Sequence, residues 1–362
     1  MKKRIVLVGS GMTLIILAGY LLSIFLTSND DLADININVK HLPVEAQAYG
    51  LVFTPVPGDA FDVFASFGVW FGEERGEPVH PFLLETPQDR LNVNLANETF
   101  SGDLVFLMKV FYNYEAAYFR VGTSTEYRKT FVLTVPSRSY LDIPFYLDSS
   151  FEVSDTASHL TVGLFLAPER HAFQDHGDLF FTPRWDVGQV LHFEINYGNE
   201  GRFVLPIPKN ETVDHVYRLF GPFFVNQDFE PLTDGVVLNA PELLQVSPNE
   251  QIELAFVSNM HGAFTTFDEA GNPLDGPDVE EILIISMLDW QQIPMSGEPY
   301  MWVNIGEDSL YGQHGRFFIE APSEPGFYEF VAFLVPNPTA PFSQETYFPL
   351  ETSDRFTIQV IE

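Results

Sequence analysis

Two stretches of this chain, TVGLFLAP at Thr161–Pro168 and EFVAFLVP at Glu329–Pro336, decide its fold class. Each is a short run rich in aliphatic and aromatic residues that ends at a proline, which favours a β-strand over a helix. Each is followed by a polar loop and then by an alternating strand, VLHFEINY at Val190–Tyr197 and RFTIQVIE at Arg355–Glu362. The repeated order predicts two tandem units of one topology.

A third similarity extends the pattern upstream, between SGDLVFLMKVFYN at Ser101–Asn113 and PNEQIELAFVSNM at Pro248–Met260. Turn-forming Pro, Gly and Asn separate short apolar runs about every 8–15 residues, as in β-sandwiches. We expect no amphipathic helix longer than about 10 residues, although short helical turns fit Phe61–Phe67 and Pro241–Leu244. The expected strands are Gly102–Tyr112, Tyr118–Val121, Thr130–Val135, His159–Ala167, Gln189–Asn196, Gln251–Val257, Ile282–Leu288, Tyr300–Asn304, Arg316–Glu320, Tyr328–Val335 and Arg355–Ile361.

The amino terminus predicts export. Residues 1–4 form a basic start, and residues 5–26 then run without a charge, which is long enough for a membrane-spanning helix. Because positive charge stays on the cytoplasmic side, we expect a single-pass signal anchor with its amino terminus inside and an extracellular ectodomain. A cleaved signal peptide is the alternative, although its apolar core is usually shorter and no small-x-small cleavage site follows Leu26.

The ectodomain is strongly acidic and has no cysteine. The formal net charge of the chain is −32, with 50 acidic and 18 basic residues, three of which precede the apolar run. Such a surface repels phosphate backbones, so we expect no nucleic-acid partner. The acidic residues are scattered, which favours adaptation to an alkaline or salty exterior over a specific cation or basic partner. The absence of cysteine excludes disulfides, thiol nucleophiles and thiolate metal sites.

The sequence divides the ectodomain into residues 35–200 and residues 207–362, with a Gly-, Asn- and Pro-rich boundary between Asn196 and Val213. The segments PGFYEFVAFLVPNP and SDRFTIQV resemble the last two strands of immunoglobulin-like modules in exported Gram-positive bacterial surface proteins, although the Cys–Trp–Cys core of antibody domains is absent. The resemblance implies an all-β chain with two tandem immunoglobulin-like β-sandwich domains after one N-terminal transmembrane helix. It implies a binding or spacing role and no catalytic residue.

Two loops are candidate metal sites. One carries His171 and His176 with nearby aspartates, although their spacing matches no zinc pattern. The other supplies hard oxygen ligands for Ca²⁺ without the spacing of a twelve-residue calcium loop. Its candidate ligands are Asp268, Asp275, Asp278 and Glu280. Both are more simply explained as polar loops, so we expect no cofactor and at most weak Ca²⁺ binding.

No catalytic or phosphate-binding motif occurs in the ectodomain, so we expect no enzymatic activity. The preferred hypothesis is a membrane-tethered interaction or spacer protein of the cell envelope, whose partner is another envelope protein or cell-wall glycan. A second hypothesis is a carbohydrate-binding or carbohydrate-processing protein, which would use exposed tryptophans among Trp70, Trp185, Trp290 and Trp302. A third is a cation-binding or solute-sensing ectodomain.

Overall fold

The computed structural model describes part of the chain, and residues 41–362 form one compact unit. The described residues are 46–56, 67–71, 82–83, 86, 88–99, 102–148, 158–169, 171, 188–196, 223–224, 243–258, 266–267, 273–274, 281–304, 313–339, 351–353 and 355–362. The expected membrane segment, residues 5–26, and most of the expected boundary near residues 196–213 lie outside these ranges. Within the described part of the chain, no helix is long and apolar enough to cross a membrane.

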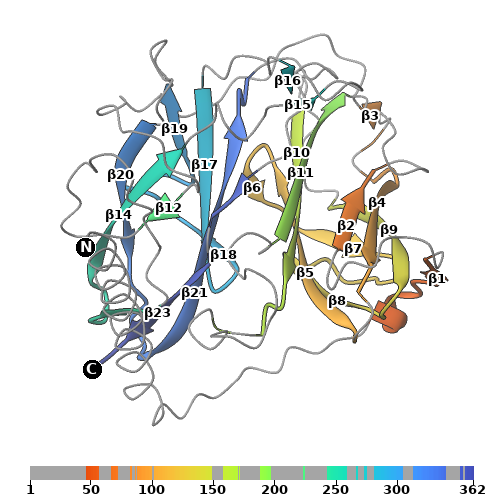
Figure 1. Cartoon of the computed structure of the whole chain (residues 1–362), viewed down its shortest axis with the longest axis horizontal. Helices are drawn as coiled ribbons and strands as arrows, with labels where there is room; N and C mark the ends of the chain where they lie inside the picture. The colour runs from red at the N-terminus through yellow and green to blue at the C-terminus, as the bar shows by residue number, and fades with distance from the viewer. Residues whose placement is uncertain are drawn as a thin grey trace, which may run out of the picture. The chain divides into compact units, whose positions relative to one another are not determined.

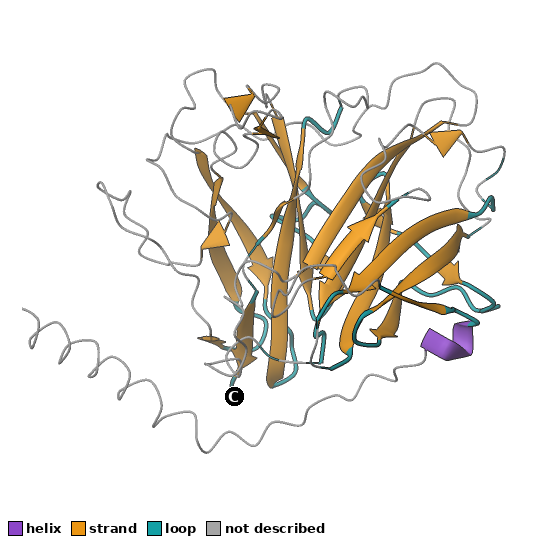
Figure 2. Cartoon of the chain, turned by 45° about the vertical axis from the view of Figure 1, so that its right-hand side comes forward, coloured by secondary structure: helices purple, strands orange, loops and turns teal. Residues whose placement is uncertain are grey.

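The described part of the chain is almost entirely β-structure, with one short 3-10 helix, η1, at Ala46–Tyr49 (Figure 2). The strands of the first half are β1 (Phe53–Pro55), β2 (Phe67–Trp70), β3 (Phe82–Leu83), β4 (Leu91–Asn97), β5 (Leu104–Tyr112), β6 (Glu115–Ala116), β7 (Phe119–Val121), β8 (Thr130–Val135), β9 (Ser139–Leu147), β10 (Ser158–Leu166) and β11 (Gly188–Asn196). Those of the second half are β12 (Phe223–Phe224), β13 (Leu243–Val246), β14 (Gln251–Ser258), β15 (Thr266–Phe267), β16 (Pro273–Leu274), β17 (Glu281–Leu288), β18 (Gln291–Ile293), β19 (Met301–Asn304), β20 (Gln313–Glu320), β21 (Gly326–Pro336), β22 (Glu351–Thr352) and β23 (Phe356–Val360).

The strands form two pairs of sheets (Figure 1). In the first pair, an outer sheet of order β1-β9-β4-β2, with β7 on β9, faces an inner sheet of order β3-β11-β10-β5-β6, with β8 on β5. In the second pair, an outer sheet of order β12-β14-β20 faces an inner sheet of order β13-β23-β21-β17-β18, with β19 on β17 and β22 on β21. Strands β15 and β16 form a separate two-stranded ribbon.

The two inner sheets share one topology. In each, a long central strand, β10 or β21, lies antiparallel between a later strand, β11 or β23, and an earlier strand, β5 or β17. The last strand of each sheet also pairs in parallel with a short edge strand, β3 on β11 and β13 on β23. The similarity between Thr161–Pro168 and Glu329–Pro336 therefore corresponds to equivalent strands.

The third sequence similarity does not correspond to equivalent strands. Ser101–Asn113 contains β5 of the first inner sheet, whereas Pro248–Met260 contains β14 of the second outer sheet. By its pairing, β5 of the first inner sheet corresponds to β17 of the second. In the outer sheets, β14 lies between β12 and β20 as β4 lies between β2 and β9, so β14 corresponds to β4. The match misled because buried strands of either sheet draw on the same few apolar residue types.

Each sheet pair encloses its own apolar core. The first core includes Val93 on β4, Phe106 on β5 and Ile143 on β9, and the second includes Leu254 on β14, Ile284 on β17 and Phe317 on β20. All of these side chains are nearly inaccessible to solvent. Two sandwich cores of this kind are what alternating inward-facing residues of facing sheets produce.

All the expected strands are present within a few residues of their predicted limits. The sequence interpretation missed the remaining strands, and the longest of these are β4, which is rich in Asn, and β9, which contains Pro144. The helical turn expected at Pro241–Leu244 is wrong, because β13 begins at Leu243 and pairs with β23. Of the other expected turn, Phe61–Phe67, only Phe67 is described, and it begins β2.

Candidate functional site

The two inner sheets pack against each other through a third apolar cluster, which we call the junction. In β17, Ile282 and Ile284 point into the second core, whereas Leu283 and Ile285, which alternate with them, point into the junction. The junction residues of the first half are Leu107, Phe111, Tyr114, Phe165 and Val190, and those of the second half are Leu283, Ile285, Met287, Trp290, Tyr300, Val331, Phe333 and Val335. Both faces of each inner sheet are therefore buried, which explains why its central strands are almost continuously apolar.

Two equivalent hairpins place an aromatic residue in the junction. Asn113 and Tyr114 have positive φ values of 47° and 70° between β5 and β6, and Asp289 and Trp290 have 47° and 64° between β17 and β18. Two successive residues with positive φ form the tight turn that matches the twist of a β-hairpin. A bulky residue in this conformation is uncommon and strained, so its presence at both turns indicates a positional requirement.

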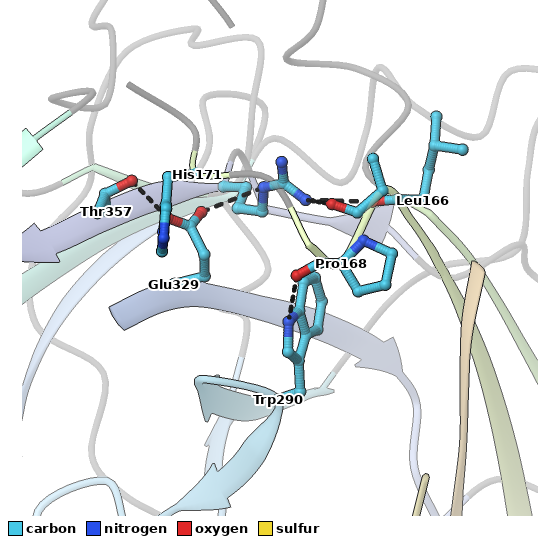
Figure 3. A network of polar contacts seen from close by, with 8 residues as sticks. Leu166, Pro168, His171, Trp290, Glu329 and Thr357 are labelled. Carbon is cyan, nitrogen blue, oxygen red and sulfur yellow. Dashed lines mark hydrogen bonds and ion pairs between the residues drawn. The ribbon is translucent and has the colours of Figure 1, made fainter. Parts of the chain in front are cut away.

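The contacts of these two aromatic residues are reciprocal. The Tyr114 hydroxyl donates to the carbonyl oxygen of Pro338, just after β21, over 2.8 Å. Trp290 Nε1 donates to the carbonyl oxygen of Pro168, just after β10, over 3.1 Å (Figure 3). Each half thus places the same hairpin against the same part of the other half, which is the pattern of a self-complementary two-fold interface within one chain.

Further polar contacts cross the junction. The fully buried Lys109 donates from Nζ to the carbonyl oxygen of Trp290 over 2.7 Å. Burial, with a smaller contribution from the charge of Lys129, lowers the pKa of Lys109 to about 8. The Gln292 side chain accepts from the amide of Ala116 and donates to the carbonyl oxygen of Tyr114. These bonds fix the relative position of the two halves in a way that apolar contact alone does not.

A buried network around Glu329 lies beside Trp290 (Figure 3). Glu329, whose side chain is 2% exposed, pairs with Arg355 over 3.2 Å and with His171 Nδ1 over 3.0 Å, and it accepts from the hydroxyl of Thr357. Arg355 Nη1 also donates to the carbonyl oxygens of Leu166 and Ala167 in the first half. These contacts tie β21 and β23 to the end of β10, and loss of one partner would leave a buried charge uncompensated.

A second polar cluster lies beneath Tyr114. His159 on β10 and His192 on β11 have nearly parallel rings, with an interplanar angle of 6°, and their Nδ1 and Nε2 atoms lie 3.0 Å apart. His192 Nδ1 lies 3.0 Å from the hydroxyl of Thr161, and the ring of Tyr114 stacks on both imidazoles. Burial lowers the pKa of His159 to about 3, and burial together with His159 lowers that of His192 well below its usual value. We call His159, His192 and Tyr114 the histidine stack.

Of the candidate metal ligands, the structure describes one. His171 lies at the junction and binds Glu329. His176, Asp268, Asp275, Asp278 and Glu280 lie outside the described residues. Among the residues that are described, no group of three or more His, Asp or Glu side chains could hold a metal ion.

The described tryptophans occupy three different environments. Trp290 is a buried junction residue, and Trp302 donates from Nε1 to Glu281 over 3.0 Å. Trp70 on β2 is partly buried and packs against Tyr140 with ring centroids 5.8 Å apart. Trp185 lies outside the described residues. The segment LDWQQIP at Leu288–Pro294, which contains Trp290, therefore forms the junction hairpin.

Sequence reasoning missed the junction itself. The signal was present in Thr161–Pro168 and Glu329–Pro336, because a strand without polar alternation is buried on both faces. The histidine stack had no such signal, since His159 and His192 lie 33 residues apart and meet only through the register of β10 and β11.

No family model matches this chain, and no curated protein sequence matches it. Two solved structures that it resembles are the C-terminal domain of the AgI/II polypeptide BspA of Streptococcus agalactiae and that of the antigen I/II-family protein AspA of Streptococcus pyogenes. Each is 8% identical with a TM-score of 0.20, over 82% of this chain and 100% of that chain. The alpha-2-macroglobulin of E. coli, at 10% identity and a TM-score of 0.20, matches 84% of this chain and 17% of that one.

The resemblance to immunoglobulin-like β-sandwich modules of Gram-positive surface proteins is a weak one. At these TM-scores the likenesses carry no argument about function. The fold and the junction define the chain as an all-β protein of two stacked sheet pairs.

Proposed function

We propose that this chain is a membrane-tethered, extracytoplasmic interaction or spacer protein of the cell envelope, without enzymatic activity. The observation that supports it best is the reciprocal junction, which joins two sandwich cores into one body. A spacer or display module needs this rigidity, because a stiff body holds a binding surface at a fixed distance from the membrane. Residues 5–26 would provide the tether and residues 1–4 the cytoplasmic end.

The same proposal accounts for the chemistry of the junction. Its buried polar groups, Glu329, Arg355, Lys109 and the histidine stack, bind one another or the backbone of the opposite half. Buried polar groups with such contacts have a structural role. The scattered acidic surface would keep the body soluble outside the cell and repel polyanions, so the partner is an envelope protein or a cell-wall glycan without dense negative charge.

Protease treatment of intact producing cells tests the location and the tether. The whole chain should stay with the membrane fraction and be digested by protease added outside the cells. A variant in which residues 1–40 are replaced by a cleavable signal peptide should be released into the medium as a folded protein. Recovery of the whole chain in the cytosol, or its resistance to added protease until the cells are lysed, would contradict the proposal.

Calorimetric titration of the released ectodomain with Ca²⁺ separates this proposal from the cation-binding alternative. We expect at most millimolar affinity, the weak end of extracellular calcium sites. Stoichiometric micromolar binding that Asp275→Asn and Asp278→Asn abolish would favour a cation-binding function instead. A panel of glycan hydrolysis assays on the same sample should show no turnover.

A further inference from the structure

The outer sheet of the first half turns one face toward the first core and the other face outward. Along β7, Phe119 and Val121 enter that core, and Arg120 between them points outward. Tyr118, two residues before Arg120, points to the same side and is 49% exposed. On β9, Tyr146 stands opposite Arg120 in the register, so it also points outward.

A segment that follows β7 in the chain completes this outward face. Residues 127–129 run antiparallel to β7 through one isolated bridge, so Tyr127 stands beside Arg120 and Lys129 beside Tyr118. The contacts agree with this register. Arg120 Nε donates to the Tyr127 hydroxyl over 3.3 Å, and Lys129 Nζ lies 5.2 Å from the centre of the Tyr118 ring. We call the five outward residues the tyrosine–cation face: Tyr118, Arg120, Tyr127, Lys129 and Tyr146.

Arg120 is held in place by three contacts. Its guanidinium carbon lies 3.8 Å from the centre of the Tyr146 ring, which is a cation–π contact. Its Nε donates to Tyr127, and its Nη1 donates to the carbonyl oxygen of Gly122 over 3.4 Å. A guanidinium group has five N–H groups, so these bonds leave others for an incoming acceptor. Because the side chain is already fixed, it loses little conformational entropy when it binds one.

The charges of this face differ from those of the rest of the chain. Among the described residues, no carboxylate forms an ion pair with Arg120 or Lys129. By contrast, the exposed Arg128 between Tyr127 and Lys129 pairs with Glu126. Carboxylates are plentiful in a chain with 50 acidic and 18 basic residues. Two neighbouring cations without a carboxylate therefore give the face a local positive charge that complements an anion from outside.

The chemistry of the face fits a sugar chain with isolated carboxylates. Its side chains are tyrosines and cations without an aliphatic residue, whereas the buried core of a protein interface is more apolar than this. A tyrosine ring packs on the apolar face of a sugar ring and its hydroxyl bonds to sugar hydroxyls. Arginine binds a carboxylate through two parallel N–H groups. The acidic surface elsewhere on the chain repels a densely charged polymer, and it repels isolated carboxylates less.

We propose, on the basis of the function proposed above, that the tyrosine–cation face binds an envelope glycan that carries isolated carboxylates. The tyrosine rings pack on sugar rings, Arg120 holds one carboxylate, and Lys129 adds a second positive charge beside it. Of the two partner classes of the proposed function, the glycan is therefore the one that this face recognises.

Calorimetric titration of the whole chain in detergent micelles with a hyaluronan octasaccharide tests this proposal. Every second sugar of this probe carries a carboxylate. We expect saturable binding that Arg120→Gln and Lys129→Gln each weaken about tenfold, because each removes a charged contact. The carboxyl methyl ester of the same octasaccharide should bind about tenfold more weakly or not at all. Arg128→Gln is the matched control, because it removes the same charge from the neighbouring residue, and its affinity should stay within about threefold.

Three results would overturn the proposal. One is that the octasaccharide does not bind. Another is that the methyl ester binds equally well, or that Arg128→Gln weakens binding as much as Arg120→Gln does, since the position of the cations would then not matter. The third is tighter binding of an octaglutamate peptide, which would indicate an acidic protein partner. If Arg120→Gln does not fold, Lys129→Gln and the methyl ester still decide. Protease treatment of intact cells tests the proposed location separately, so the two proposals can fail independently.

Discussion

At the scale of single residues, Lys109 carries a charge in a buried position at an energetic cost. Its side chain is fully buried, and the hydrogen bond to Trp290 replaces only part of the hydration that an ammonium group loses. Since its pKa is about 8 in the folded protein and 10.5 in the unfolded chain, the unfolded chain binds more protons between these values. Stability should therefore rise with pH through this window, and the full penalty applies below about pH 8.

Replacing Lys109 by methionine should stabilise the protein at neutral pH. A flexible apolar side chain of similar length fills the same space without a charge, and the expected gain is on the order of 1–3 kcal/mol in the free energy of unfolding. Urea unfolding of both proteins at about pH 7.5 and pH 9.5 measures it, and the advantage of Lys109→Met should shrink at the higher pH. A variant that is less stable than the parent at pH 7.5 would show that the bond to Trp290 outweighs the buried charge.

At the scale of elements, the junction depends on the two hairpins that carry Tyr114 and Trp290. Tyr114→Phe removes the hydroxyl and leaves the Pro338 carbonyl without that donor, at a cost of about 1–3 kcal/mol. Thermal and urea unfolding give the change. Tyr118→Phe is the matched control, because Tyr118 is 49% exposed, and it should change stability by less than about 0.5 kcal/mol. Equal effects of the two substitutions would show that the Tyr114 hydroxyl does not stabilise the junction.

Gly163 in the middle of β10 has a packing role. A Cβ atom there would lie 2.5 Å from the ring of Phe165, which belongs to the junction. Gly163→Ala should therefore destabilise the protein by about 1–3 kcal/mol as the ring is displaced. Gly326→Ala, at the start of β21, meets only Tyr328 at an ordinary 3.4 Å and should be nearly neutral, within about 0.5 kcal/mol. If the unfolding midpoints of both variants fall equally, the loss of stability comes from replacing glycine in a strand and not from displacing the Phe165 ring.

Element type was predictable from the sequence, and element position was predictable where apolar residues are dense. Strands such as β10 and β21 give a strong local signal, whereas β9 contains Pro144, which lacks a backbone donor and therefore suggests a strand end. Its remaining residues alternate regularly between buried and accessible, so tertiary pairing with β4 overrides the proline. The Glu329 network and the histidine stack were not predictable, because their members meet only through strand register and the packing of one half on the other.

At the scale of the whole molecule, the junction bears on whether the two halves behave as independent domains. Each half has its own core, which favours independent folding of residues 35–200 and 207–362, and this remains a prediction. Each half would also expose an apolar face if it were alone, and burying one Leu, Ile, Val or Phe side chain is worth roughly 1.5–3 kcal/mol. The separated halves should therefore bind each other.

Mixing the two halves as separate polypeptides is the most direct test of the claim that the junction joins them. Residues 35–200 and 207–362, refolded together, should elute as a one-to-one complex and unfold in a single transition. Val331→Asp in the junction should abolish the complex, whereas Phe318→Asp, at a side chain that is 39% exposed on β20, should leave it intact. Halves that fold, stay monomeric and do not associate on mixing would contradict the account.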